Sequence, residues 1–318
     1  MANAWSSAKT AQKESKADKP PMRDMKAHYA ELFAKKRSRT QSIRMALVGK
    51  ENTAKTGLAV DIARQHIGAK KGIVIFDVDN SAVQTIAANY AEDENITIIP
   101  LYDELDDTIF NADNSTNYTA LVDKMTYFIN IVAQKCRDEE VGAVIMDGMS
   151  SFLKWCEFAM TDVLLNRSNN PVNVDDGDKF NQAEWRIRNK LFKDVVNRAH
   201  QLPVDAVFFN FHLKDKKQFA DLGNGQKGLM KIGEEPEWDK GTMRLFSQQI
   251  WMSRYTKKGD MAAGVKSDKN LNLNEWQIRA SIEEMKGFNM EHLGKEYTVL
   301  TVADGAVDWT GLPFLNWG

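Results

Sequence analysis

The chain has 318 residues, of which 43% are hydrophobic and 27% are charged, and its formal net charge is −2 at pH 7. This length allows one large or two ordinary domains with a sizeable core, and the near-neutral charge excludes a polycation made throughout for nucleic acid. No apolar run reaches the ~18 residues of a membrane helix, so we expect no membrane partner. Cys136 and Cys156 are too few for a disulfide framework and are not spaced like metal ligands, which favours a reducing cytoplasm.

The first 40 residues differ in composition from the rest. Ten Lys or Arg and four Asp or Glu give residues 1–40 a local charge of +6, which leaves −8 for the remainder. Residues 1–22 are rich in Ala, Ser and Lys and end in Pro-Pro, which indicates a disordered arm, and residues 23–38 favour a short basic helix. The arm has no apolar core and is not a signal peptide. It would contact nucleic acid or a partner, or only aid solubility, and we predict one folded domain over 41–318.

Expected strands and helices alternate through most of that domain. Apolar runs such as residues 72–76 (GIVIF) are continuous, which is typical of strands buried on both faces. The alternation predicts an α/β fold in three layers, with a mostly parallel sheet and helices on both faces. After residue 244 we predict an antiparallel C-terminal extension of the same sheet. The expected strands are 43–48, 72–76, 96–99, 141–146, 204–211, 245–255, 274–285 and 296–302, and the expected helices are 55–67, 81–91, 117–138 and 182–200.

Residues 46–60 (ALVGKENTAKTGLAV) pass from an expected strand through a polar turn into an expected helix. A phosphate-binding loop has this layout, with a Lys for the β- and γ-phosphates and a Thr for Mg²⁺, here Lys55 and Thr56. Ala54 replaces the second glycine of the motif, so the loop must hold Ala54 at negative φ or accept strain. A polar turn with a chance Lys-Thr pair is the alternative. The candidate nucleotide-binding residues are Gly49, Lys50, Glu51, Asn52, Thr53, Ala54, Lys55, Thr56 and Gly57.

Polar residues follow three other expected strands. Asp147 ends VGAVIMD, where it would hold Mg²⁺ together with the threonine of the loop, unless it only caps the next helix. Asp77 and Asp79 follow the second strand, where a carboxylate would orient or deprotonate an attacking water, or belong to a solvated turn. Asn210 and His212 leave the fifth strand, where one of them would sense the γ-phosphate. A buried, satisfied histidine explains His212 equally well.

Taken in order, these pieces resemble the RecA-like P-loop ATPases, in particular the single-domain recombinase-type ATPases of phages and archaeal viruses. The resemblance covers about residues 43–155 and 184–290. It implies ATP and Mg²⁺, a DNA-associated role in recombination, annealing or replication, and the cytoplasm of a prokaryote or of an infected prokaryotic host. Three departures concern the hydrolysis rate: Ala54 in place of glycine, Asp79 in place of the catalytic glutamate, and no second arginine after Lys286.

The same resemblance assigns residue roles. SIEEMKGF is similar to a late strand whose basic residue reaches the neighbouring subunit's nucleotide, which implies this role for Lys286 and a homo-oligomeric ring or filament. Thr56 and Asp147 would be the metal ligands. The implied catalytic residues are Lys55, Asp79, Asp147, His212 and Lys286.

In RecA-like proteins, DNA binds to the loops that follow the Walker B strand and the next strand, here roughly 157–181 and 213–242. The second of these segments has lysines around Phe219, a combination that suits single-stranded nucleic acid. A polar loop at 256–270 would join the same surface, and an ordinary solvated loop is the alternative. The candidate DNA-binding residues are Lys214, Lys216, Lys217, Lys227 and Lys231.

A second family is also similar. Lys50 lies five residues before Lys55, which is the spacing of the signature lysine in ParA/MinD-type partition and positioning ATPases, and FDVDNS is similar to the end of their second strand. Both loop glycines of that family are replaced here, by Glu51 and Asn52, and Asn80 replaces its proline. We therefore keep a nucleotide-switched dimer as the alternative, beside a binding module that holds nucleotide without hydrolysing it.

Overall fold

The computed structural model describes residues 42–138, 140–165, 180–221, 227–239, 241–285 and 290–313. The predicted arm over residues 1–40 lies outside them. A ten-stranded sheet runs through the described part in the order β12-β11-β10-β8-β1-β5-β4-β2-β3, with the short β9 paired to β8. Its strands are β1 (Ile43–Gly49), β2 (Gly72–Asp77), β3 (Ile96–Pro100), β4 (Val141–Asp147), β5 (Ala206–Phe211), β8 (Gln248–Thr256), β9 (Lys266–Ser267), β10 (Glu275–Met285), β11 (Glu296–Ala303) and β12 (Ala306–Trp309).

The centre of the sheet is parallel. Strand β5 pairs in parallel with β1 on one side and with β4 on the other. Strands β2 and β3 continue this direction beyond β4, and β8 continues it beyond β1. The antiparallel extension is confirmed for β10, β11 and β12. The first strand of that region differs from the prediction, because β8 is parallel to β1. Periodicity shows that a segment is a strand, but it does not show the direction of its pairing.

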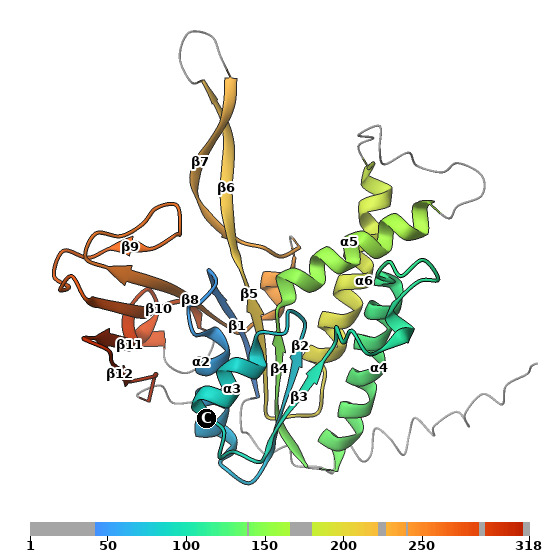
Figure 1. Ribbon diagram of the computed structural model, residues 1–318, viewed down its shortest axis with the longest axis horizontal. Coiled ribbons are helices and arrows are strands. Elements are labelled where there is room, and N and C mark those ends of the chain that lie inside the picture. Colours follow the sequence, from blue (N-terminus) through green and yellow to red (C-terminus); the bar gives the residue numbers. More distant parts are fainter. Residues whose placement is uncertain are drawn as a thin grey trace, which may run out of the picture. The chain divides into compact units, whose positions relative to one another are not determined.

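Helices cover both faces of the sheet (Figure 1). One core packs α4, α5 and α6 against the side chains of Val48, Phe76 and Phe209, and the other packs α2 and α3 against those of Met45, Leu47 and Ile75. Alternate residues of one strand therefore contribute to opposite cores. The predicted three-layer α/β class is confirmed, and the arrangement is consistent with a RecA-like fold. The helices are α2 (Lys55–Ile67), α3 (Ala82–Asn89), α4 (Tyr118–Arg137), α5 (Met149–Leu165) and α6 (Gln182–His200), with short 3₁₀ turns at Asp107–Ile109, Thr242–Leu245 and Met290–His292.

A two-stranded hairpin extends from the sheet after β5 (Figure 1). It consists of β6 (Leu213–Asp221) and β7 (Lys227–Pro236), which pair antiparallel. Residues 213–242 were expected to be a loop, and for the hairpin this prediction is wrong. Its strands have no face buried in the core, so they lack the apolar alternation that identifies a strand in a sequence. The start of the other expected DNA loop, at 157–165, belongs to α5, and residues 166–179 are outside the described part.

Candidate functional site

The carboxyl ends of the central parallel strands meet at a cleft of about 980 Å³. Its walls come from the loop after β1, the turn after β2, the start of α5, the ends of β5 and β8, and the base of the hairpin. Ligands of open α/β sheets bind at this edge. The cleft brings together most of the residues predicted from the sequence: Lys50, Glu51, Asn52, Thr53, Ala54, Lys55, Thr56, Asp79, Asp147, Asn210 and His212.

The loop between β1 and α2 contains left-handed residues. Ala54 has φ 57° and Asn52 has φ 55°. Of the two alternatives predicted for Ala54, the structure has the strained one, because positive φ is unfavourable for a residue with a Cβ. Gly49 is needed where the loop begins, since a Cβ there would lie 2.5 Å from Thr53 Oγ1 and 2.7 Å from the carbonyl oxygen of Met252.

Ala54 is also the N-cap residue of α2. It makes no side-chain capping hydrogen bond, so the first turn of α2 begins without the acceptor that Ser, Thr or Asp would supply. The first N–H groups of a helix have no intrahelical partner, and they favour an anion. Gly57 is buried within this first turn. The loop therefore leaves N–H donors for a phosphate.

Lys55 is buried at the base of this loop. Its Nζ donates hydrogen bonds to the carbonyl oxygens of Gly49 (3.1 Å) and Lys50 (2.8 Å), and within the described residues it forms no ion pair. Burial lowers the pKa of Lys55 to about 8, although the nearby charges of Asp147 and Asp79 act in the opposite direction. A phosphate would supply the missing counter-charge and raise this pKa again.

Thr56 and Asp147 meet at the bottom of the cleft. Thr56 Oγ1 donates a hydrogen bond to Asp147 Oδ2 (2.6 Å), and Asn210 Nδ2 donates one to Asp147 Oδ1 (2.7 Å). Burial raises the pKa of Asp147, and the two hydrogen bonds oppose that shift. The Oδ1 of Asn210 is buried and has no hydrogen-bond partner among the described residues, so an acceptor beside Asp147 is available.

This set of oxygen atoms fits Mg²⁺. The ion prefers oxygen ligands and is held by one or two protein side chains plus phosphate oxygens and waters. Thr56 and Asp147 would supply the protein oxygens, and Asn210 Oδ1 beside Asp147 would be an acceptor for a water of the ion. Within the described ranges, no group of three or more His, Cys, Asp or Glu forms a complete metal site. The remaining ligands would come from nucleotide and water.

The two acidic residues after β2 have different roles. Asp77 is fully buried and accepts hydrogen bonds from the backbone N–H groups of Ser81 (3.1 Å) and Ala82 (3.0 Å), at the start of α3. Burial raises the pKa of Asp77 to about 6. Asp79 lines the cleft, and its Oδ2 lies 3.8 Å from Nε2 of His212. The nearby imidazole of His212 lowers the pKa of Asp79, which keeps Asp79 ionised and suits it to orient a water.

Two features of the backbone hold Asp79 and His212 in position. Gly148 has φ 80°, and a Cβ there would lie 3.0 Å from Asp79 Cγ, so glycine lets Asp79 lie against the end of β4. The backbone N–H of His212 donates to Ser150 Oγ (2.9 Å), whose hydroxyl donates to the carbonyl oxygen of Glu237 (3.0 Å). His212 itself is half-buried and faces the cleft. Of the two explanations for His212, its position fits a residue of the site.

Lys50 links the loop to the hairpin. Its Nζ lies 3.3 Å from Glu234 and 3.7 Å from Asp215, at the base of β7 and β6. Lys231 contacts the same carboxylates, at 2.7 Å from Asp215 and 3.6 Å from Glu234. If Lys50 were the signature lysine of a ParA/MinD-type dimer and reached the partner's nucleotide, it would have to break these ion pairs.

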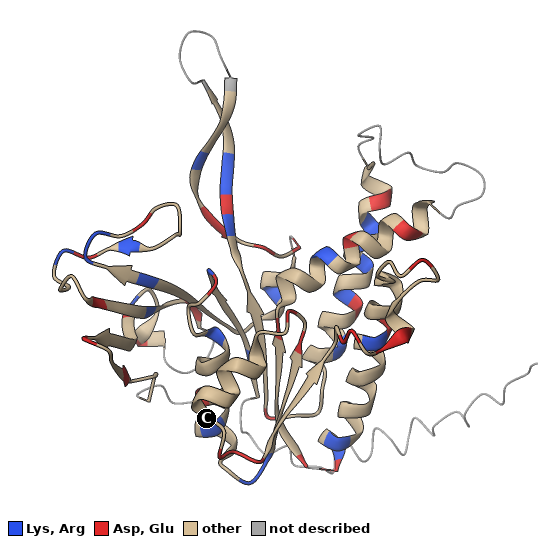
Figure 2. Ribbon diagram, in the orientation of Figure 1, with Lys and Arg blue, Asp and Glu red and all other residues tan. Residues whose placement is uncertain are grey.

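The predicted DNA-binding lysines are on the hairpin, where basic and acidic residues are mixed (Figure 2). Lys214 lies 3.9 Å from Glu235, and Lys231 belongs to the network just described. Lys216 and Lys217 are exposed and form no ion pair within the described part of the chain. The side chain of Lys227 and the whole of Lys286 lie outside the described residues.

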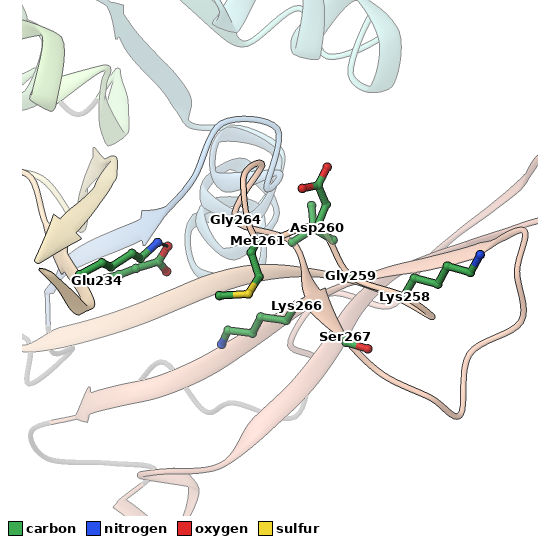
Figure 3. Close-up of a pocket in the computed structure, with 10 residues that line it drawn as sticks. Glu234, Lys258, Gly259, Asp260, Met261, Gly264, Lys266 and Ser267 are labelled. Atoms are coloured by element: carbon green, nitrogen blue, oxygen red, sulfur yellow. Dashed lines mark ion pairs between the residues drawn. The ribbon is translucent and has the colours of Figure 1, made fainter. Parts of the chain in front are cut away.

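A second cavity, of about 350 Å³, lies between the base of the hairpin and residues 258–267 (Figure 3). Lys231, Lys258 and Lys266 line it, together with Glu234. Figure 3 shows that Lys258 and Lys266 extend in opposite directions, so the basic groups do not converge. A ligand site needs convergent polar groups, and the larger cleft has them.

Sequence reasoning missed Arg254 as a residue of the cleft. Arg254 lies near the end of β8, two residues after Met252, which is opposite Gly49 of β1. Its guanidinium stacks on the ring of Trp276 in β10, 4.4 Å from the centroid. The residue lay within an expected strand, but only the pairing of β8 with β1 brings it to the phosphate loop.

No protein-family model matches the chain, and no curated protein matches it. Among solved structures, a KaiC-like protein of the hyperthermophilic archaeon Pyrococcus horikoshii OT3 is similar, with 12% identity, 85% of this chain and 90% of that chain covered, and a TM-score of 0.40. At this TM-score the similarity carries no argument about function. Among the described helices, none has the length and apolar character to cross a membrane.

Proposed function

We propose that this chain is a magnesium-dependent P-loop ATPase of the RecA-like kind. The observation that supports it best is the meeting of Lys55, Thr56 and Asp147 in one cleft at the carboxyl edge of a parallel sheet. Lys55 and the first N–H groups of α2 bind the β- and γ-phosphates, and Thr56 and Asp147 hold Mg²⁺. Asp79 orients the attacking water, and His212 beside it responds to the γ-phosphate.

Release of inorganic phosphate from ATP by the purified protein tests this proposal. We expect release in Mg²⁺ and none in excess EDTA, and loss of activity in Lys55→Ala and Asp147→Asn. Lys70→Ala is a suitable control, because Lys70 is an exposed lysine at the opposite, amino end of β2. The proposal fails if the wild-type protein has no magnesium-dependent affinity for ATP or GTP.

We further propose that single-stranded DNA is the working partner, in recombination, annealing or replication. The hairpin supports this proposal. Lys216 and Lys217 are exposed and unpaired within the described residues, and Phe219 is 71% exposed opposite Leu229. Exposed lysines attract a phosphate backbone, and an exposed aromatic ring can stack on bases.

Binding of a labelled single strand at several salt concentrations tests the DNA proposal. The double change of Lys216 and Lys217 to alanine should weaken binding and reduce its salt dependence, since each phosphate contact contributes about one unit to the slope. Lys70→Ala should leave both unchanged. Equal binding by the double variant and the wild type would reject the hairpin as the DNA surface, and a lack of stimulation of phosphate release by DNA would reject DNA as the working partner.

The proposed assembly is a homo-oligomeric ring or filament in which Lys286 of one subunit reaches the nucleotide of the next. Changing Lys286 to alanine should then reduce phosphate release more than ATP affinity. The nucleotide-switched dimer predicts a different critical residue, Lys50. The ion pairs of Lys50 with Glu234 and Asp215 of its own chain favour the ATPase over the switch.

A further inference from the structure

Arg254 is the basic residue of the cleft that lacks a polar partner. Within the described part of the chain its side chain makes no hydrogen bond and no ion pair, and its Nε is buried without an acceptor. A buried donor without a partner is unfavourable, because the group has lost its water and gained nothing in return. The other basic residues of the cleft each contact an acceptor within the chain: Lys50, Lys55, Lys154 and His212.

The fold holds Arg254 in a fixed place. Its guanidinium lies over the Trp276 ring, and the indole in turn packs against the core that contains Ile278 and Met252. Stacking on an aromatic face restrains a guanidinium without using its N–H donors. The N–H donors of Arg254 are therefore held in place without a hydrogen-bond partner among the described residues. Arg254 lies on β8, on the side of β1 away from Asp147.

We propose that Arg254 binds a phosphate group of the nucleotide in the cleft, from within the same chain. This inference rests on the proposed nucleotide site. A guanidinium presents a planar fork of donors that matches two phosphate oxygens. A phosphate would accept hydrogen bonds from the terminal N–H groups of Arg254, which have no partner within the described residues and, unlike Nε, are not buried. Lys55 and Arg254 then contact the phosphates from two different strand ends, β1 and β8.

Binding of Mg-ATP and of Mg-tripolyphosphate to variants of Arg254 tests the proposal. Tripolyphosphate has the phosphates of the nucleotide without its base and ribose. We expect Arg254→Ala to weaken both ligands by about ten- to a hundredfold, as for loss of a charged hydrogen bond, and Arg254→Lys to lose less. Arg254→Gln keeps a shorter polar side chain without the charge, and it serves as the second variant if the alanine protein does not fold.

Arg279→Ala is the matched control. Arg279 also stacks on an aromatic ring, that of Tyr255 at 4.3 Å, but it is paired with Asp268 and does not line the cleft. Its change should leave both affinities unaltered. Wild-type protein that binds neither ligand would reject the nucleotide site itself. Wild-type binding with unchanged affinity in Arg254→Gln would reject only the role of Arg254, and a loss confined to Mg-ATP would place Arg254 on the base or ribose instead.

Discussion

Replacing Ala54 by glycine is expected to stabilise the fold slightly, whereas replacing an alanine inside a helix by glycine should destabilise it. Ala54 has φ 57°, and this left-handed conformation costs a residue with a Cβ ~1–2 kcal/mol. Glycine avoids that cost but loses ~0.5–1 kcal/mol more backbone entropy on folding. Removing a half-buried methyl group costs a further ~0.4 kcal/mol, half the value for a fully buried one. The balance favours Ala54→Gly by about 0.5 kcal/mol.

Ala87→Gly is the matched control, because Ala87 is exposed and lies within α3. Glycine in a helix costs ~1 kcal/mol, so the two variants should differ by about 1.5 kcal/mol in the free energy of unfolding. Urea denaturation resolves a difference of this size when the slopes are equal. Equal destabilisation by both variants would show that residue 54 is not left-handed and would refute the description of the loop. Nucleotide affinity should remain in Ala54→Gly, since no donor is removed.

Three further predictions concern the site. Thr56→Val should remove the magnesium dependence of nucleotide affinity, measured as the ratio of dissociation constants with Mg²⁺ and with EDTA; an unchanged ratio would exclude Thr56 as a ligand. The affinity for Mg-ATP should fall as the pH rises above 8, because the pKa of Lys55 in the free protein is about 8 and the ammonium is lost above it; a constant affinity between pH 7 and 9.5 would contradict this. Lys50→Ala should change phosphate release little, because its ion pairs are partly exposed and such pairs contribute about 1 kcal/mol or less; complete loss of activity would favour the nucleotide-switched dimer.

The central strands and the loop were predictable because their signals are local. Strands β2, β4 and β5 are buried on both faces, which gives continuous apolar runs in the sequence. Gly49, Lys55 and Thr56 belong to one short loop and its ends, so their proximity follows directly from their spacing in the sequence. Asp147 followed from its place at the end of a buried strand, since parallel strands end at the same edge. Each of these predictions required only the assignment of a single strand or loop.

The features that were missed depend on long-range pairing. No local pattern shows that β8 lies beside β1, and without that pairing Arg254 has no relation to the loop. Lys50 forms ion pairs with Asp215 and Glu234 only because the base of the hairpin lies beside the loop. The hairpin itself was missed because its strands have no face buried in the core and so lack a regular alternation of apolar and polar residues.

The electrostatics of the cleft are better explained by a ligand that carries both positive and negative charge than by a contribution to the stability of the fold. Burial raises the pKa values of Asp77 and Asp147, and each is raised further by a neighbouring carboxylate, Asp147 for the first and Asp79 for the second. Burial also lowers the pKa of Lys55, which contacts no carboxylate within the described ranges. An arrangement selected for stability alone would bring the lysine and the carboxylates together as a pair. Keeping them apart leaves room between them for a ligand that carries both signs, and a phosphate chain with its magnesium ion is such a ligand.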